Sequence, residues 1–159
     1  MNEQIKSYIK TESAISAAFN FFINGMAAAL IYHKADIVPT DIVSIAIDLL
    51  ISCVSICVLT ALFSKASVKR TKTLGILETE RKAVRFISRL FRRPAVFGVL
   101  AGMASAVIIY IPTVLFFVLT GTLSIAFGLY VVLKSLFAAL AGGVITALEL
   151  YAGMCKPKP

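Results

Sequence analysis

Apolar residues fill four long stretches of the chain, and shorter polar segments separate them. The stretches cover residues 13–32, 42–63, 95–119 and 122–152. Each is apolar on all sides instead of along one face, and each holds the roughly 20 residues that a helix needs to cross a bilayer core. The pattern predicts an all-α integral membrane protein with four membrane-spanning helices and argues against a soluble bundle.

The composition supports this prediction. Of the 159 residues, 59% are hydrophobic, and there is no tryptophan. A soluble domain of this size rarely carries so much apolar sequence, because too few polar residues remain to cover its outside. Charges of both signs precede the first stretch and three more apolar stretches follow it. We therefore expect residues 13–32 to be a retained span and not a cleaved signal peptide.

Basic residues concentrate between the second and third stretches. Residues 64–94 hold ten of the 16 lysines and arginines, whereas the two other loops hold only Lys34. Basic loops stay on the cytoplasmic side of a membrane. We therefore expect a multi-pass protein of the cell (inner) membrane with both termini in the cytoplasm. Nucleic-acid binding also uses basic segments, but basic flanks are usual beside membrane spans, so we expect no nucleic-acid partner.

The basic segment divides the chain into two similar halves. Residues 1–63 form an N-terminal two-span hairpin, residues 64–94 a basic cytoplasmic linker and residues 95–159 a C-terminal two-span hairpin. Residues 25–29 (GMAAA) resemble residues 102–106 (GMASA), and residues 44–46 and 124–126 both read SIA. These matches predict a parallel internal duplication, in which each hairpin begins and ends on the same side.

Within the linker, residues 78–93 have the pattern of an amphipathic helix. Large apolar residues such as Val84 and Ile87 share one side, and arginines share the other. Such a helix would lie in the membrane interface and bind anionic lipid head groups. A solvated linker helix is the alternative. The candidate lipid-binding residues are Arg81, Arg85, Arg89 and Arg92.

Polar side chains recur at helical spacing within the first two stretches. Unpaired polar groups are costly in lipid, so these stripes should face protein or water. We expect Asn24 and Asp48 to lie at a similar depth and to meet across the first hairpin. Hydrogen bonds between helices are the alternative role, above all for the serines. The stripes are Glu12, Ser16, Asn20 and Asn24, and then Asp41, Ser44, Asp48, Ser52 and Ser55.

Lys134 is the second unusual residue, because it lies about twelve residues into the fourth stretch, near the middle of the membrane. Its ammonium group could pair with Asp48 or contact an anionic solute. It could also extend along its stem toward the interface. A buried pair of Asp48 and Lys134 could be purely structural.

Other reactive residues give little support for an enzyme. His33 is the only histidine, and no nucleophile and base stand at a recognisable spacing. The thiols of Cys53 and Cys57 lie one turn apart and are best explained by packing, so we expect no metal site and no cofactor. Glu12 and Glu149 lie near the cytoplasmic ends of their spans, where we expect them to reach the interface or cap a helix.

Together these patterns predict a small four-span transporter or channel for a small polar or charged solute. The alternative is a non-catalytic membrane subunit that stabilises or regulates a larger complex. Small residues at four-residue spacing, including Gly98 and Gly102, predict close helix contacts within the chain or in a homo-oligomer, or with another membrane protein. The predicted path residues are Asn20, Asn24, Ser44, Asp48, Ser52 and Lys134.

Overall fold

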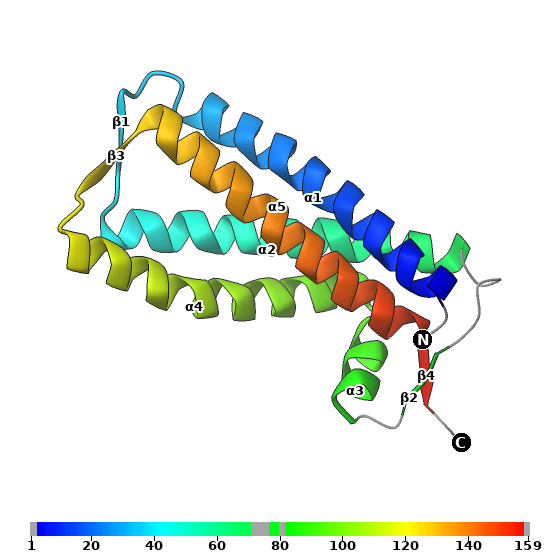
Figure 1. Cartoon of the computed structure of the whole chain (residues 1–159). Helices are drawn as coiled ribbons and strands as arrows, with labels where there is room; N and C mark the ends of the chain where they lie inside the picture. The colour runs from blue at the N-terminus through cyan, green and yellow to red at the C-terminus, as the bar shows by residue number, and fades with distance from the viewer. Residues whose placement is uncertain (1–2, 71–76, 80–81, 158–159) are drawn as a thin grey trace.

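The computed structural model describes residues 3–70, 77–79 and 82–157 (Figure 1). Helices dominate this part of the chain, and four short strands connect or follow them. The elements in chain order are α1 (Glu3–Ile31), β1 (Ile37–Pro39), α2 (Ile42–Arg70), β2 (Leu77–Thr79), α3 (Lys82–Leu90), α4 (Pro94–Thr120), β3 (Ser124–Ala126), α5 (Phe127–Met154) and β4 (Cys155–Pro157).

Among the described residues, four helices are long and apolar enough to cross a membrane, namely α1, α2, α4 and α5. A helix satisfies its own backbone hydrogen bonds, which a segment in lipid requires. Large apolar side chains such as Phe22, Val107 and Leu140 are exposed on the outer faces of these helices. Such surfaces fit a hydrocarbon environment and would be unfavourable in water. The prediction of four helices long and apolar enough to span a membrane is confirmed, and they indicate a multi-pass membrane protein.

The fourth span begins later than the sequence predicted. We expected a helix from residue 122, but residues 124–126 form β3 and α5 begins at Phe127. Gly121 ends α4 in the left-handed conformation, with φ at 64°, which glycine adopts without a steric penalty. Its N–H bonds back to Val118, and the chain then leaves in an extended conformation.

The two loops at this end of the molecule pair with each other. β1 and β3 form an antiparallel ribbon in which Val38 lies opposite Ile125. The hydroxyl of Thr40 donates to the carbonyl oxygen of Thr122 at 2.7 Å, and the Thr40 N–H donates to Leu123. At the opposite end, β2 pairs in parallel with β4. The sequence patterns predicted neither pairing.

The long helices pack in an order that differs from their order in the chain. α1 packs along α5, α2 packs along α4, and α2 and α5 form the central contact, whereas α1 barely touches α2. In Figure 1 the α1–α5 pair crosses the α2–α4 pair, and the two pairs diverge toward the β1–β3 ribbon. Helices joined by a loop are therefore not the main packing partners.

Small residues bring the paired helices close together. A Cβ atom at Gly98 would lie 2.5 Å from the Cα of Val58, and one at Gly102 would lie 2.5 Å from the Cα of Val54. On α5, a Cβ atom at Gly142 would collide with the side chain of Asn20. The prediction that these small residues mark close helix contacts is confirmed, and the contacts lie within the chain.

α3 is shorter than the helix that the sequence predicted. It begins at Lys82, and the predicted start at residue 78 lies in β2. Two of its apolar residues, Ile87 and Leu90, pack against a buried cluster that includes Phe91 and Phe97. Part of its apolar side therefore rests on the protein.

Candidate functional site

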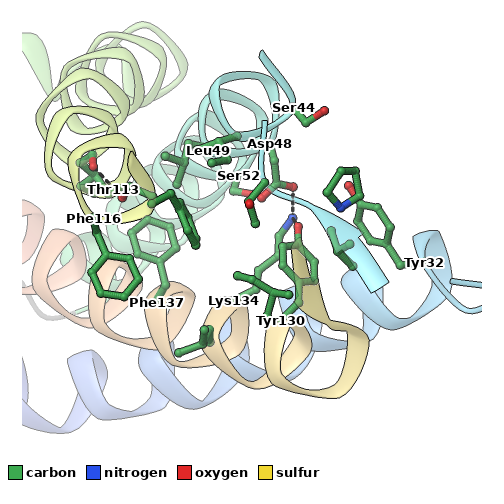
Figure 2. A pocket seen from close by; sticks show the side chains of 18 of the residues that line it. Tyr32, Ser44, Asp48, Leu49, Ser52, Thr113, Phe116, Tyr130, Lys134 and Phe137 are labelled. Atoms are coloured by element: carbon green, nitrogen blue, oxygen red, sulfur yellow. Dashed lines mark hydrogen bonds and ion pairs between the residues drawn. The ribbon is translucent and has the colours of Figure 1, made fainter. Parts of the chain in front are cut away.

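The most prominent candidate site is a cavity of about 410 Å³ near the β1–β3 ribbon, which we call the ribbon-end cavity. Side chains from α2, α4 and α5 form its walls, and Tyr32 and the ribbon also line it (Figure 2). It forms where the two helix pairs diverge. Its walls are mostly apolar and include Phe116, Phe117 and Phe137. The volume is in the range of small-molecule sites, which are usually apolar with a few placed polar groups.

An ion pair between Asp48 on α2 and Lys134 on α5 provides the charges of this cavity. Both residues lie about two turns from the start of their helices, so they stand at the same height. Lys134 was expected about twelve residues into its span, and the start of α5 at Phe127 shortens this distance. Figure 2 shows the two side chains pointing at each other across the α2–α5 contact.

Burial makes this pair unequal. The Lys134 side chain is 9% exposed, whereas that of Asp48 is 27% exposed and faces the cavity. The Lys134 ammonium group also donates to the hydroxyl of Tyr130 at 3.2 Å, and it lies 5.5 Å from the centre of that ring. The Tyr130 ring packs edge-on against Tyr32 at 5.1 Å. The cation is thus held by three contacts, and the carboxylate is the more accessible partner.

This arrangement can bind a charged group of a solute by exchanging partners. A solute cation would compete with Lys134 for Asp48, and a solute anion would compete with Asp48 for Lys134. A solute that carries both charges would keep both residues paired, whereas a singly charged solute would leave one of them without a counter-ion, which a low-dielectric site disfavours. The aromatic walls can meanwhile bury the apolar part of such a solute.

The serines of the second stripe lie on the same side of α2. Ser44 and Ser52 both line the ribbon-end cavity, one helical turn before and after Asp48. Ser44 also donates its backbone N–H to the carboxylate of Asp41 at 3.0 Å. This bond caps α2. Hydrogen bonds from Ser44, first from its side-chain hydroxyl and then from its backbone N–H, lower the pKa of the Asp41 carboxyl group.

A second cavity of about 240 Å³ lies between α1, α2 and α5 toward the α3 end of the molecule, and we call it the α3-end cavity. It shares no lining residue with the ribbon-end cavity. The polar residues that line it are Glu12, Ser16, Asn20, Thr60, Ser64, Ser67 and Thr146.

Hydrogen bonds join the polar groups of α1 to α5 beside this cavity. The Thr146 hydroxyl donates to the Ser16 oxygen at 2.7 Å, and the Ser16 hydroxyl donates to the carbonyl of Gly142 at 3.3 Å. The Asn20 amide donates to the carbonyl of Ser16 at 2.9 Å. Asn24 donates to the carbonyl of Asn20 at 3.1 Å and lines neither of the two cavities. The first stripe therefore serves partly as interhelical hydrogen bonding.

The structure divides the predicted path between two places. Ser44, Asp48, Ser52 and Lys134 come together at the ribbon-end cavity, and Asn20 lies at the α3-end cavity. Asn24 and Asp48 do not meet as expected, since Asp48 pairs with α5 and α1 packs mainly on α5.

Glu149 lies where the sequence did not place it. We expected this side chain to reach the interface or cap a helix, but it is 0% exposed. Neither carboxyl oxygen has a hydrogen-bond partner among the described residues. Because α5 packs between α1 and α2, the side chain is enclosed. Glu12 differs, since it is partly exposed and accepts a hydrogen bond from Ser67 at 3.2 Å.

Two of the four candidate lipid-binding arginines lie among the described side chains. Arg89 and Arg92 are exposed, as is Phe86 on α3. Arg81 lies outside the described residues, and so does the side chain of Arg85. The three cysteines are buried and unpaired, and the described residues contain no cluster of metal-ligating side chains.

Sequence reasoning missed Tyr130, which contacts Lys134 directly. A signal was available, because Tyr130 precedes Lys134 by four residues and side chains at this spacing share a helix face. Tyr32 and Thr146 were missed because their roles depend on which helix each one meets.

Comparison of the chain with protein-family models, with curated proteins and with solved structures finds no match. The function must therefore be inferred from the site itself.

Proposed function

We propose that this protein is a small membrane transporter for a small polar or charged solute, which binds in the ribbon-end cavity between Asp48 and Lys134. The observation that carries the proposal is an ion pair in the wall of a cavity between apolar helices. Ionisable residues within membrane segments are rare and often mark a solute or ion pathway. A purely structural pair would need no cavity of about 410 Å³ beside it.

The separation of the two cavities favours a transporter over an open channel. The ribbon-end and α3-end cavities lie toward opposite ends of the helices, and they have no lining residue in common. A channel needs a continuous path, whereas a carrier exposes its site to one side at a time. The transported solute would carry a charge for the ion pair and an apolar part for the aromatic wall.

Uptake into liposomes tests this proposal. Purified protein would be reconstituted, and the entry of radiolabelled leucine, benzoate and benzylamine would be compared with protein-free liposomes. Leucine carries both charges, benzoate carries a negative charge and benzylamine carries a positive charge. We expect at least one to enter faster with the wild type, and we expect Asp48→Asn and Lys134→Gln to abolish this gain. The proposal would be contradicted if none of the three probes entered faster than into protein-free liposomes. It would also be contradicted if both variants took up a probe as fast as the wild type.

The orientation that we propose places the termini and residues 64–94 in the cytoplasm, where the basic residues favour them. In a variant whose three native cysteines are replaced by serine, a membrane-impermeant thiol reagent should label Lys34→Cys from outside intact cells. It should not label Lys69→Cys. The reverse pattern would invert the orientation.

Similar packing of the two halves supports an internal duplication. The order helix–strand–helix occurs twice, as α1–β1–α2 and as α4–β3–α5. The close contact of α1 with α5 corresponds to that of α4 with α2, and the two strands pair with each other. Residues 44–46 are helical and residues 124–126 are extended, however, so the SIA match that first indicated the duplication joins unlike structures.

α3 is also proposed to contact anionic lipid head groups through its exposed arginines. Arg89 and Arg92 are available for this contact, and Phe86 could enter the interface beside them. Replacing Arg89 and Arg92 with glutamine should reduce co-purification of anionic phospholipid. An unchanged lipid content would leave α3 as a solvated linker helix.

A subunit of a larger membrane complex is the second candidate. The hydrogen bonds that join Ser16, Asn20 and Thr146 support it, because they give that part of the polar stripe a structural role. Purification in mild detergent would favour this candidate if a second membrane protein accompanied the chain at a fixed ratio and no solute entered liposomes.

A further inference from the structure

The buried carboxyl group of Glu149 is not used by the proposed solute site. It lies in α5 near the α3 end, is 0% exposed and has no hydrogen-bond partner for either oxygen among the described residues. The hydroxyl of Ser64 on α2 is also buried and unpartnered. Buried polar groups normally find partners, so two orphaned groups that face each other require an explanation.

The groups around Glu149 come mainly from α2. They are the hydroxyls of Ser64 and Thr60 and the thiol of Cys57. Thr60 already donates its proton to the carbonyl of Ile56 at 2.8 Å. On α1, the titratable group in the adjacent cavity wall is Glu12, a second acid. No cation among the described residues forms an ion pair with Glu149.

These surroundings suit a neutral carboxyl group. An ionised carboxylate without a nearby cation is strongly disfavoured in a dry interior. The protonated acid fits the same space at a much lower cost. A bound proton therefore explains why the structure accommodates Glu149 without a charged partner.

A route for this proton leads to the α3-end cavity. Ser64 faces Glu149 and also lines that cavity. Thr146 and Leu150, which flank Glu149 on α5, line it as well. The hydroxyl of Ser64 thus lies between the carboxyl group and the space that water can enter.

We infer that Glu149 is a proton-binding site that exchanges its proton with water in the α3-end cavity through Ser64. On release, the carboxyl O–H bond breaks and its electron pair stays on the carboxylate. Ser64 accepts this proton and passes its own to a water molecule, which becomes hydronium. Binding reverses these steps. That this proton is coupled to solute movement rests on the proposed transport function.

Infrared spectroscopy of the protein in lipid nanodiscs tests the site without any transported solute. The carbonyl band of a protonated carboxyl group should disappear reversibly as the pH is raised, in the wild type and in the matched control Glu12→Gln. Glu149→Gln should lack this band at every pH. The inference is overturned if the band survives until the protein unfolds, because Glu149 would then be a permanently protonated structural acid. An identical titration in Glu149→Gln would overturn it too.

The route is tested by exchange into heavy water. Replacing the carboxyl proton with deuterium shifts the same band, so the rate of the shift reports proton access. Ser64→Ala should slow this exchange at least tenfold, whereas Ser67→Ala, another serine of the same cavity, should leave it unchanged. Equal rates in the wild type and Ser64→Ala would exclude the route through Ser64.

Coupling is measured separately in the liposome assay. An inward acid gradient should change solute uptake several-fold in the wild type, and Glu149→Gln should lose this dependence. If the infrared band titrates but the protein moves no solute, the proton site would be supported and the transport function contradicted. Uptake that ignores the gradient would contradict the coupling.

Discussion

Asp48 and Glu149 are both acids on the contact between α2 and α5, yet their surroundings are opposite. Asp48 faces the ribbon-end cavity, is 27% exposed and pairs with Lys134. Glu149 is 0% exposed, and the groups that face it are hydroxyls and a thiol. The first acid suits a site where charges are exchanged, and the second suits a site where a proton is held. The two acids differ in their partners and in their exposure, and these differences separate the two roles more than depth in the membrane does.

The largest effect is expected from Asp48→Asn. The change keeps the size of the side chain but leaves the Lys134 ammonium group buried without its counter-ion. Loss of one partner of a buried pair costs about 3–5 kcal/mol, and the partial exposure of Asp48 places the expected loss near the lower end. Unfolding in detergent by increasing denaturant would measure it. A variant as stable as the wild type would show that the pair contributes little to folding.

Lys134→Met should cost less than Asp48→Asn. The stranded carboxylate is the more exposed partner, so it can accept water or a proton, and we expect a loss of about 1–3 kcal/mol. Adding Asp48→Leu to Lys134→Met should recover most of this loss, because well-packed apolar residues often replace a buried pair without cost. A double variant whose loss equals the sum of the single losses would mean that the two residues act independently.

Tyr130→Phe removes the hydroxyl that supports the Lys134 ammonium group while keeping the ring against Tyr32. We expect a loss of about 1 kcal/mol, as is typical of one hydrogen bond. In the liposome assay this variant should bind solute more weakly and still transport it. Tyr110→Phe, on α4 outside the ribbon-end cavity, is the control and should change neither property.

Glu149→Gln should change stability by no more than about 0.5 kcal/mol, because glutamine resembles the protonated acid in size and adds no charge. The same exchange of acid for amide is therefore expected to be severe at Asp48 and mild at Glu149. Equal losses at the two positions would remove the distinction and would indicate an ionised Glu149.

Asp41 has an exposed carboxyl group and serves as a reference, and its replacement should have the smallest effect on stability. Its hydrogen bonds to Ser44 lower its pKa in the folded protein. This contribution to stability is complete above the unfolded-state pKa and disappears as the pH falls through the lower folded-state pKa. Asp41→Ala should thus be slightly less stable near neutral pH and equal to the wild type in strong acid. A difference that persisted in acid would require another cause.

The sequence predicted the spans because hydrophobic length is a local property. It located α4 almost to the residue, and it identified Asp48 and Lys134 because charges within apolar helices are costly. It misplaced the start of α5, since β3 forms by pairing with β1, which is distant in the chain. That error also placed Lys134 further from the start of its helix than the structure does.

The pattern of apolar and polar residues did not predict which helices pack against each other. Ser16 and Asn20 belong to the first polar stripe, which was expected to face protein or water. Gly142 on α5 allows α1 to approach closely, and the Ser16 hydroxyl donates to the carbonyl oxygen of Gly142. Glu149 was expected to reach the interface or cap a helix, because the pattern did not show which helices cover its position. Whether a side chain near a helix end is buried depends on the neighbouring helix, and α1 and α2 enclose this one.

The pairing of α1 with α5 has a consequence for biosynthesis. During translation α1 is made first and α5 last, and α1 has little contact with its neighbour α2. The Ser16–Asn20 stripe must therefore remain without Gly142 and Thr146 until the whole chain has entered the membrane. The β1–β3 ribbon also forms only at that stage. Assembly should be a late, concerted step, and truncation before α5 should leave α1 without its partner, as a substrate for membrane quality control.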